Sequence, residues 1–253
     1  MKIKIKHLIV FVILISFLAS YFFPGIGDDP RVQNSITFIG ILFGIIVGFF
    51  IADLYSRYQG IRDNAGTEVS ALRGFYLFSK VLAKENNKKK WLKEVEIRIN
   101  NYIRKFMPLQ WENYSETEKE FIELNKSIEE IQYEGSKSAE TFASLLDAHS
   151  KHSDARENLV MFGKDKLSWG EWLTTLFLGG LLLVSLFYTK DTSLISTLFT
   201  GAITSAILLL FIVLRDLNNL NFGENAVSIE PYERVLDAIG KPRYYKTKRR
   251  AVI

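Results

Sequence analysis

One row of side chains on a predicted helix could control the passage of ions. Ile41, Ile45, Phe49 and Asp53 recur every four residues within the apolar stretch 36–55. Residues four apart lie on one face of an α-helix, so these side chains form a single stripe. Repeated around a shared axis, the three apolar side chains would form a constriction that blocks ions by losing its water, with a ring of carboxylates at one end.

A second stripe on the same helix consists of glycine. Gly40, Gly44 and Gly48 each precede one of the large apolar residues, and the missing side chains allow another backbone to approach closely. Such stripes are widespread at ordinary helix contacts in membranes. The glycines therefore predict a helix-packing edge, and a pore and simple helix packing remain alternatives at this point.

The sequence gives no support for covalent chemistry. The chain lacks G-x-G-x-x-G, P-loop, G-x-S-x-G and H-E-x-x-H motifs, and it contains no cysteine. His149 and His152 lie one helical turn apart with Asp147 and Asp154 nearby, but a solvated helix face explains this spacing better than a metal site does. We predict a protein that is not an enzyme, with no catalytic residues, no cofactor and no bound metal.

Four apolar stretches are candidates for membrane spans. Charged residues make up 24% of the chain, yet Asp53 is the only one in the ranges 8–23, 36–55, 172–188 and 194–214. A spanning helix needs about 20 apolar residues, with about 17 as the lower end, so the first and third stretches are short but usable. The first stretch follows several lysines as in a signal peptide, but it is longer than a usual signal-peptide core and lacks a good cleavage site. We therefore predict four retained spans.

The basic residues orient these spans. Only Arg31 lies between the first two stretches and only Lys190 between the last two, whereas the other 30 of the 32 Lys and Arg residues lie elsewhere. Cytoplasmic loops carry an excess of Lys and Arg, so both short loops are expected outside the cell and both termini inside it. The predicted location is the plasma membrane, with the chain crossing it several times.

The predicted fold class is all-α, with four transmembrane helices and a helical cytoplasmic domain. Apolar residues at helical spacing continue beyond the second span as far as a break at Pro108, and further helical patterns follow it. The predicted parts are a transmembrane hairpin at 1–55, a helical cytoplasmic domain at 56–171, a second transmembrane hairpin at 172–214 and a cytoplasmic tail with a short helix and a basic end at 215–253.

Two segments carry a resemblance to a known family. The first is Phe49-x5-Tyr55-x-Arg57-Tyr58-x3-Arg62, preceded by Ile41 and Ile45, which resembles the second transmembrane helix of bestrophins. The second runs from Asp216 to Glu224 and continues with Glu230-Pro231-Tyr232-Glu233-Arg234, similar to the segment that follows the membrane in that family. The bacterial bestrophin-like branch is the best match. Bestrophins are pentameric ion channels, so the resemblance implies that Ile41, Ile45 and Phe49 form this chain's pore neck.

The chain departs from the family pattern at two places. Animal bestrophins follow the Phe-Gly-Glu segment with aspartates that bind calcium, whereas Glu224 here is followed by Asn225, Ala226 and Val227, so no calcium clasp is expected. Asp53 stands where bacterial relatives carry an uncharged amide. A ring of carboxylates there favours cations, although Arg57, one helical turn further on, could pair with Asp53 and cancel that preference.

The sequence thus predicts an oligomeric passive channel for an inorganic ion, and the resemblance to bestrophins implies that the oligomer is a pentamer. The alternative is a membrane-anchored helical interaction or scaffold protein without transport activity, and a secondary transporter is a third reading. The predicted partners are other copies of the chain and membrane lipids, with no nucleic acid. The basic tail between Lys241 and Arg250 either contacts anionic head groups or only fixes the topology.

Overall fold

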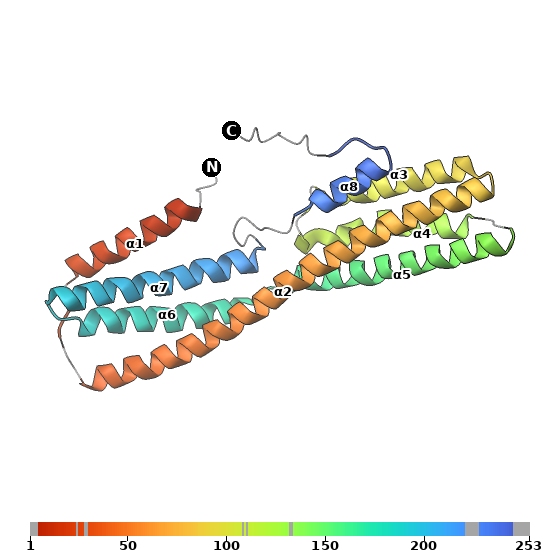
Figure 1. The fold of residues 1–253 in the computed structure, drawn as a ribbon. Helices are drawn as coiled ribbons and strands as arrows, with labels where there is room; N and C mark the ends of the chain where they lie inside the picture. The colour runs from red at the N-terminus through yellow and green to blue at the C-terminus, as the bar shows by residue number, and fades with distance from the viewer. Residues whose placement is uncertain are drawn as a thin grey trace. The chain divides into compact units, whose positions relative to one another are not determined.

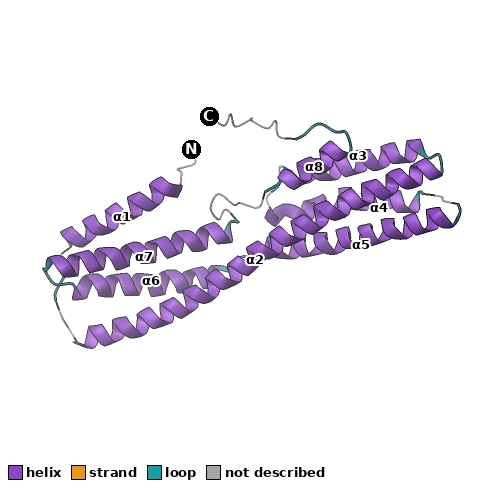
Figure 2. Cartoon of the chain, viewed as in Figure 1, coloured by secondary structure: helices purple, strands orange, loops and turns teal. Residues whose placement is uncertain are grey.

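The structure is a computed structural model that describes residues 5–23, 25–27, 30–107, 109, 111–131, 134–220 and 228–244. Helices dominate, and none of these residues forms a β-strand (Figure 2). The expected all-α class is therefore confirmed for this part of the chain. In order along the chain, the helices are α1 (Ile5–Phe22), α2 (Pro30–Glu85), α3 (Lys89–Phe106), the 3-10 helix η1 (Trp111–Thr117), α4 (Glu118–Glu129), α5 (Ser136–Lys164), α6 (Trp169–Thr189), α7 (Leu194–Asn218) and α8 (Glu230–Ala238).

The chain divides into two compact units, and the boundary falls inside α2. Unit 1 comprises Met1–Ser56 with Lys166–Ala226, and unit 2 comprises Arg57–Asp165 with Val227–Ile253. In Figure 1, α1 lies beside α7 and α7 beside α6, and both pairs are in contact. Each unit thus combines segments that lie far apart in the sequence. The four-part division expected from the sequence stays a prediction.

Three helices among the described residues are long and apolar enough to cross a membrane. These are Val32–Glu85, Trp169–Thr189 and Leu194–Asn218, whereas His7–Phe22 is a shorter apolar helix. All four apolar stretches expected from the sequence are therefore helical. The count of four spans stays a prediction, because α1, with 18 residues, is close to the lower limit of about 17 residues for a spanning helix.

Unit 1 is held together by apolar side chains from α2, α6 and α7. Phe43, Val47 and Leu54 of α2 pack with Leu178 of α6 and Leu214 of α7 in one buried cluster. Two glycines permit close helix packing: a Cβ at Gly179 would lie 2.6 Å from the Phe211 ring, and one at Gly201 would lie 2.8 Å from the Phe17 ring. At these points only glycine leaves room for the facing aromatic ring.

The ends of the apolar helices are closed by hydrogen bonds within unit 1. Ser168 and Glu171 form a reciprocal capping box at the start of α6, in which the Ser168 amide donates to Glu171 Oε2 at 2.6 Å and the Glu171 amide donates to Ser168 Oγ at 3.3 Å. At the opposite end of α6, the buried Lys190 donates through Nζ to the carbonyl oxygen of Ser20, in the last turn of α1, and to that of Phe23, which follows α1. A cation at that helix end compensates the orphan carbonyls and the helix dipole.

Candidate functional site

The α2 helix has two different faces within unit 1. Phe43, Val47 and Leu54 are buried, with exposed fractions of 3%, 2% and 1%. The predicted neck residues Ile41, Ile45 and Phe49 are instead exposed by 60%, 62% and 76%, in a single copy of the chain. Three large apolar side chains at four-residue spacing therefore form a stripe that this chain does not cover. Such a stripe requires lipid or another protein surface against it.

The glycine stripe lies open as well. A Cβ added at Gly44 or Gly48 would meet no other atom within 4 Å, and one at Gly40 would meet only Leu182, at 3.8 Å. The chain's own helices therefore do not use the close approach that these glycines permit, in contrast to Gly179 and Gly201.

An apolar hollow adjoins the exposed stripe in unit 1. It has a volume of about 580 Å³ and lies between α2 and the first turns of α6, where Ile45, Phe49 and Phe50 face Glu171 and Thr174. Two of the lining side chains, Ile45 and Phe49, belong to the stripe that the sequence singled out. It gives this edge of unit 1 a shape into which a side chain from another molecule could fit.

The two charged residues near the end of the stripe differ in their surroundings. Asp53 is exposed, whereas Arg57 retains only 2% of its surface. Arg57 Nε donates to the carbonyl oxygen of Phe162 at 2.7 Å, and its Nη2 donates to the carbonyl oxygen of Gly163 at 3.0 Å. These carbonyls belong to the last turn of α5, where they have no partner within the helix. The guanidinium therefore caps α5 inside unit 2.

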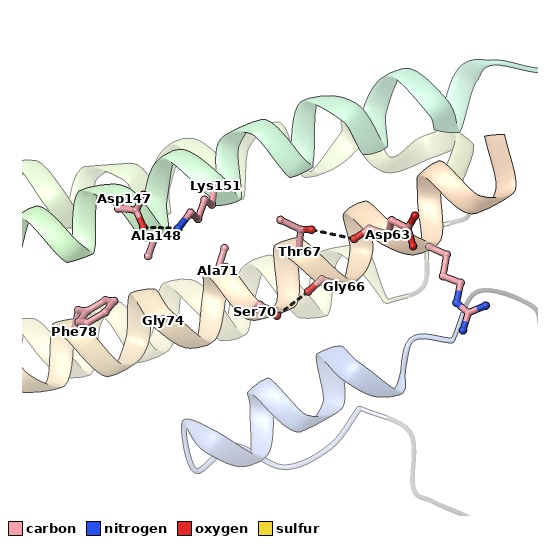
Figure 3. Close-up of a pocket in the computed structure, with 11 residues that line it drawn as sticks. Asp63, Gly66, Thr67, Ser70, Ala71, Gly74, Phe78, Asp147, Ala148 and Lys151 are labelled. Carbon is pink, nitrogen blue, oxygen red and sulfur yellow. Dashed lines mark hydrogen bonds and ion pairs between the residues drawn. The ribbon is translucent and has the colours of Figure 1, made fainter. Parts of the chain in front are cut away.

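A groove runs between α2 and α5 within unit 2 (Figure 3). Its volume is about 780 Å³, and small residues of α2, including Gly66, Ser70 and Gly74, form much of its wall. On the α5 side, Lys151 Nζ and Asp147 Oδ2 form an ion pair at 2.6 Å. The groove is wide and mixed in polarity, and it has no cluster of side chains aimed at one point.

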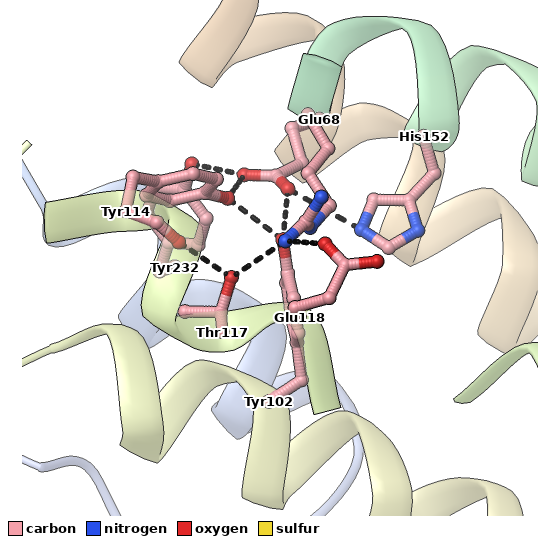
Figure 4. A network of polar contacts seen from close by, with 8 residues as sticks. Glu68, Tyr102, Tyr114, Thr117, Glu118, His152 and Tyr232 are labelled. Atoms are coloured by element: carbon pink, nitrogen blue, oxygen red, sulfur yellow. Dashed lines mark hydrogen bonds and ion pairs between the residues drawn. The ribbon is translucent and has the colours of Figure 1, made fainter. Parts of the chain in front are cut away.

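A buried carboxylate forms the most elaborate polar cluster among the described residues (Figure 4). Glu68 of α2 is fully buried and accepts hydrogen bonds of 2.5 Å from the hydroxyls of Tyr102, Tyr114 and Tyr232. His152 Nε2 lies 3.3 Å from Glu68 Oε1, a distance at which a protonated imidazole forms an ion pair with the carboxylate. All five side chains belong to unit 2. We call this set the Glu68 cluster.

The electrostatics of the Glu68 cluster favour one protonation pattern. Burial alone raises the pKa of Glu68, but His152 and the tyrosine hydroxyls lower it by more, so the pKa lies below its ordinary value. Burial and the Glu68 charge raise the pKa of Tyr102, Tyr114 and Tyr232 well above the usual tyrosine value. At neutral pH the cluster therefore holds a charged carboxylate surrounded by neutral phenol donors.

The sequence analysis did not identify the Glu68 cluster, and its expectation of a solvated helix face was wrong for His152, which is only 1% exposed and lies against Glu68. One signal of the cluster was nevertheless present. Ile61, Ala65, Leu72 and Phe75 are buried and share the helical period of Glu68, which makes Glu68 a carboxylate on the apolar face of α2. An ionisable residue in such a position needs partners. Those partners come from sites distant in sequence, so the sequence pattern alone could not name them.

The remaining sequence candidates have ordinary surroundings or lie outside the described residues. His149 is half-buried against the rings of Phe75 and Phe121, and burial lowers its pKa. No group of metal-binding side chains was found among the described residues. In the basic tail, Arg243 pairs with Asp237 at 2.6 Å. Outside the described residues lie the rest of that tail from 245 onward and the segment 221–227, on which the calcium expectation rests.

Comparison with known proteins identifies the family of this helical chain. The sequence matches the profile of the Bestrophin-like domain over residues 8–232. The chain belongs to the Bestrophin-like family, as the two resembling segments indicated. No curated protein matches the sequence.

Solved structures of a bacterial bestrophin homologue from Klebsiella pneumoniae share the fold. One single-residue variant is 16% identical with a TM-score of 0.65, and the match covers 92% of this chain and 99% of that chain. A second variant is 15% identical with a TM-score of 0.65, over 95% and 100% of the two chains. A third structure of the homologue is 15% identical with a TM-score of 0.59, over 94% and 99%. These matches therefore extend over nearly the whole of both chains.

Proposed function

We propose that the protein is a homo-oligomeric, pentameric ion channel of the plasma membrane, with Ile41, Ile45 and Phe49 as its neck. The observation that carries this proposal is the uncovered apolar stripe of α2, since its three large side chains face away from the core of their own chain. Around a shared axis they would form a narrow dry constriction that opens when it becomes wet. Membership of the Bestrophin-like family supports the same arrangement.

The glycine stripe supplies the contact edge in this proposal. Gly44 and Gly48 have open space beside them, so the α2 helix of a neighbouring copy can approach closely. The hollow at Ile45 and Phe49 would receive side chains of the same neighbour. In this arrangement the four apolar helices cross the membrane, both termini face the cytoplasm, and lipids contact the outer helices and the basic tail.

Asp53 then supplies the charge at the inner end of the neck. Its carboxylate is exposed, whereas the Arg57 guanidinium is buried and hydrogen-bonded to the end of α5. A ring of Asp53 carboxylates attracts cations and repels anions. We therefore propose a preference for inorganic cations.

A membrane-anchored interaction protein is the second candidate function. The groove of about 780 Å³ between α2 and α5 favours it, because the groove is large enough to hold part of a partner. In that case the apolar helices would only hold unit 2 at the membrane. The two candidates differ in their oligomeric state and in ion flux.

The proposed function is tested by the mass of the oligomer together with ion flux through liposomes. Native mass spectrometry of the detergent-solubilised protein should give a closed ring of five 29.1 kDa chains. Replacing Ile41, Ile45 and Phe49 by Ala should widen the neck and raise ion flux through liposomes. The matched control replaces Leu173, Leu176 and Phe177, which are also exposed but lie on α6, by Ala and should leave flux unchanged. A stable monomer without flux would overturn the channel and favour the anchored interaction protein.

A further inference from the structure

The Glu68 cluster joins segments that are far apart along the chain. Tyr102 comes from α3, Tyr114 from η1, His152 from α5 and Tyr232 from α8, and all of them meet one carboxylate of α2 (Figure 4). A buried charge is stable only when its hydrogen-bonding capacity is satisfied. The cluster therefore depends on the simultaneous presence of all these segments.

Tyr232 differs from the other donors in where it stands in the chain. The other donors belong to the continuous stretch Arg57–Asp165, whereas Tyr232 belongs to α8, which follows the apolar helix α7. The Tyr232 hydroxyl donates to Glu68 Oε2, and the Tyr232 ring packs against Phe106 of α3 with 4.8 Å between ring centroids. The same side chain thus makes both an apolar contact and a polar contact.

The α8 helix is too short to be stable without these contacts. It spans the nine residues Glu230–Ala238. Isolated helices shorter than about 12–15 residues are marginal in water, so α8 would unfold when it leaves its docking site. Val235, Leu236 and Ile239 bury the apolar side of this segment. Docking and folding of α8 are therefore one event.

We propose that Glu68 and Tyr232 form a latch that fastens α8 onto the part of α2 in unit 2. The latch is closed while the Tyr232 hydroxyl donates to the ionised carboxylate, and loss of that bond makes release and unfolding of α8 more frequent. Apolar packing positions α8, and the hydrogen bond to the charged carboxylate determines how often α8 leaves its docking site. This role concerns unit 2 alone and does not depend on ion conduction.

The bond has enough strength for this role. A hydrogen bond to a charged group typically contributes about 1.5–3 kcal/mol, more than a bond between neutral groups. Its loss should therefore raise the frequency of α8 opening by about tenfold or more. The amides of short, locally unfolding segments report such openings through hydrogen exchange.

Hydrogen–deuterium exchange of the full chain tests the latch. Tyr232→Phe keeps the ring on Phe106 but removes the hydroxyl, and should speed exchange of the α8 amides by about tenfold or more. Glu68→Gln should speed the same amides. The matched control is Tyr76→Phe. The buried Tyr76 hydroxyl lies 3.5 Å from Glu96 Oε1 in the same unit and has no bond to Glu68. This variant should leave the exchange rate of the α8 amides at the wild-type value.

Two results would overturn the latch. One is unchanged α8 exchange in Tyr232→Phe, which would mean that apolar packing alone holds the helix. The other is equally faster exchange in α2, α3 and α5, which would mean a general loss of stability rather than release of one segment. Should Glu68→Gln fail to fold, Tyr232→Phe and Tyr76→Phe decide the matter by themselves.

Discussion

Arg57 and Phe162 are joined by a hydrogen bond of 2.7 Å from the guanidinium Nε to a carbonyl oxygen in the last turn of α5. A second bond, of 3.0 Å, joins Arg57 Nη2 to the carbonyl oxygen of Gly163. A cation at the C-terminal end of a helix donates hydrogen bonds to carbonyl oxygens that have no partner within the helix. Its charge also interacts favourably with the helix dipole. Arg57 is therefore a structural residue of unit 2.

The first prediction concerns the stability contributed by Arg57. Arg57→Gln removes a charged donor from the α5 terminus and should lower the free energy of unfolding by about 2 kcal/mol. The control is Arg62→Gln, since Arg62 is exposed on the same helix and its loss should change stability by less than about 0.5 kcal/mol. Urea unfolding in detergent gives both values. Equal stabilities of the two variants would contradict a capping role.

The second prediction concerns charge selectivity at Asp53. In the proposed channel, where Arg57 is held at the end of α5, the exposed Asp53 carboxylates would dominate the field at the inner end of the neck. The wild type should show a cation-side reversal potential in a salt gradient, and Asp53→Asn should move it toward zero. Asp154→Asn, an exposed carboxylate of α5, serves as the control. An anion-side potential that Asp53→Asn leaves unmoved would refute this assignment.

The third prediction concerns the acid dependence of the Glu68 cluster. The pKa of Glu68 is lowered in the folded protein, so its contribution to stability is complete above the ordinary value of 4.5 and declines as the pH falls through the folded pKa. The stability difference between the wild type and Glu68→Gln should therefore be constant near neutral pH and shrink below about pH 4.5. Denaturant unfolding at a series of pH values measures it, and a difference that grows in acid would show a raised pKa.

The fourth prediction concerns the open glycines of α2. Gly44→Leu and Gly48→Leu add bulk where the single chain has free space, so each chain should fold normally, but close approach of a second α2 helix becomes impossible. Native mass spectrometry should show smaller species or monomers. Gly180→Leu, which also has open space around it but lies on α6, should keep the oligomer. Intact oligomers for both α2 variants would exclude the glycine edge from the interface.

Local patterns in the sequence predicted the helices and placed three large apolar side chains on one face of α2. Helical spacing of Ile41, Ile45 and Phe49 required only residues that are neighbours along the chain. The hydrogen-bond acceptors of the Arg57 guanidinium were not predictable in this way. Asp53 is its neighbour on the helix, whereas the carbonyls of Phe162 and Gly163 lie over a hundred positions away in sequence. Local spacing suggested a pair with Asp53, and long-range packing gave Arg57 different acceptors.

The partners of Glu68 were likewise not predictable from local spacing in the sequence. Glu68 stands on the buried face of α2, and this position could have been recognised as a carboxylate that needs partners. Its donors at Tyr102, Tyr114 and Tyr232 come from three other segments, and only the tertiary fold brings them together. Each of these tyrosines by itself resembles an ordinary core aromatic residue.

The central claim is that the exposed stripe of α2 lines an ion path, and the absence of cysteine makes a direct test possible. A single Phe49→Cys variant places the only thiol of each chain in the proposed neck. Phe177→Cys places it instead on α6, where the phenylalanine is exposed by 63% and is expected to face lipid. Both variants are treated with a membrane-impermeant thiol reagent, and mass spectrometry then reports whether each thiol has reacted.

Ion flux through liposomes should then be measured before and after treatment with a membrane-impermeant thiol reagent. We expect modification to abolish flux through Phe49→Cys, because the adduct fills the constriction, and to leave flux through Phe177→Cys unchanged. Undiminished flux through Phe49→Cys molecules that carry the adduct would contradict the claim that this residue lies in the ion path.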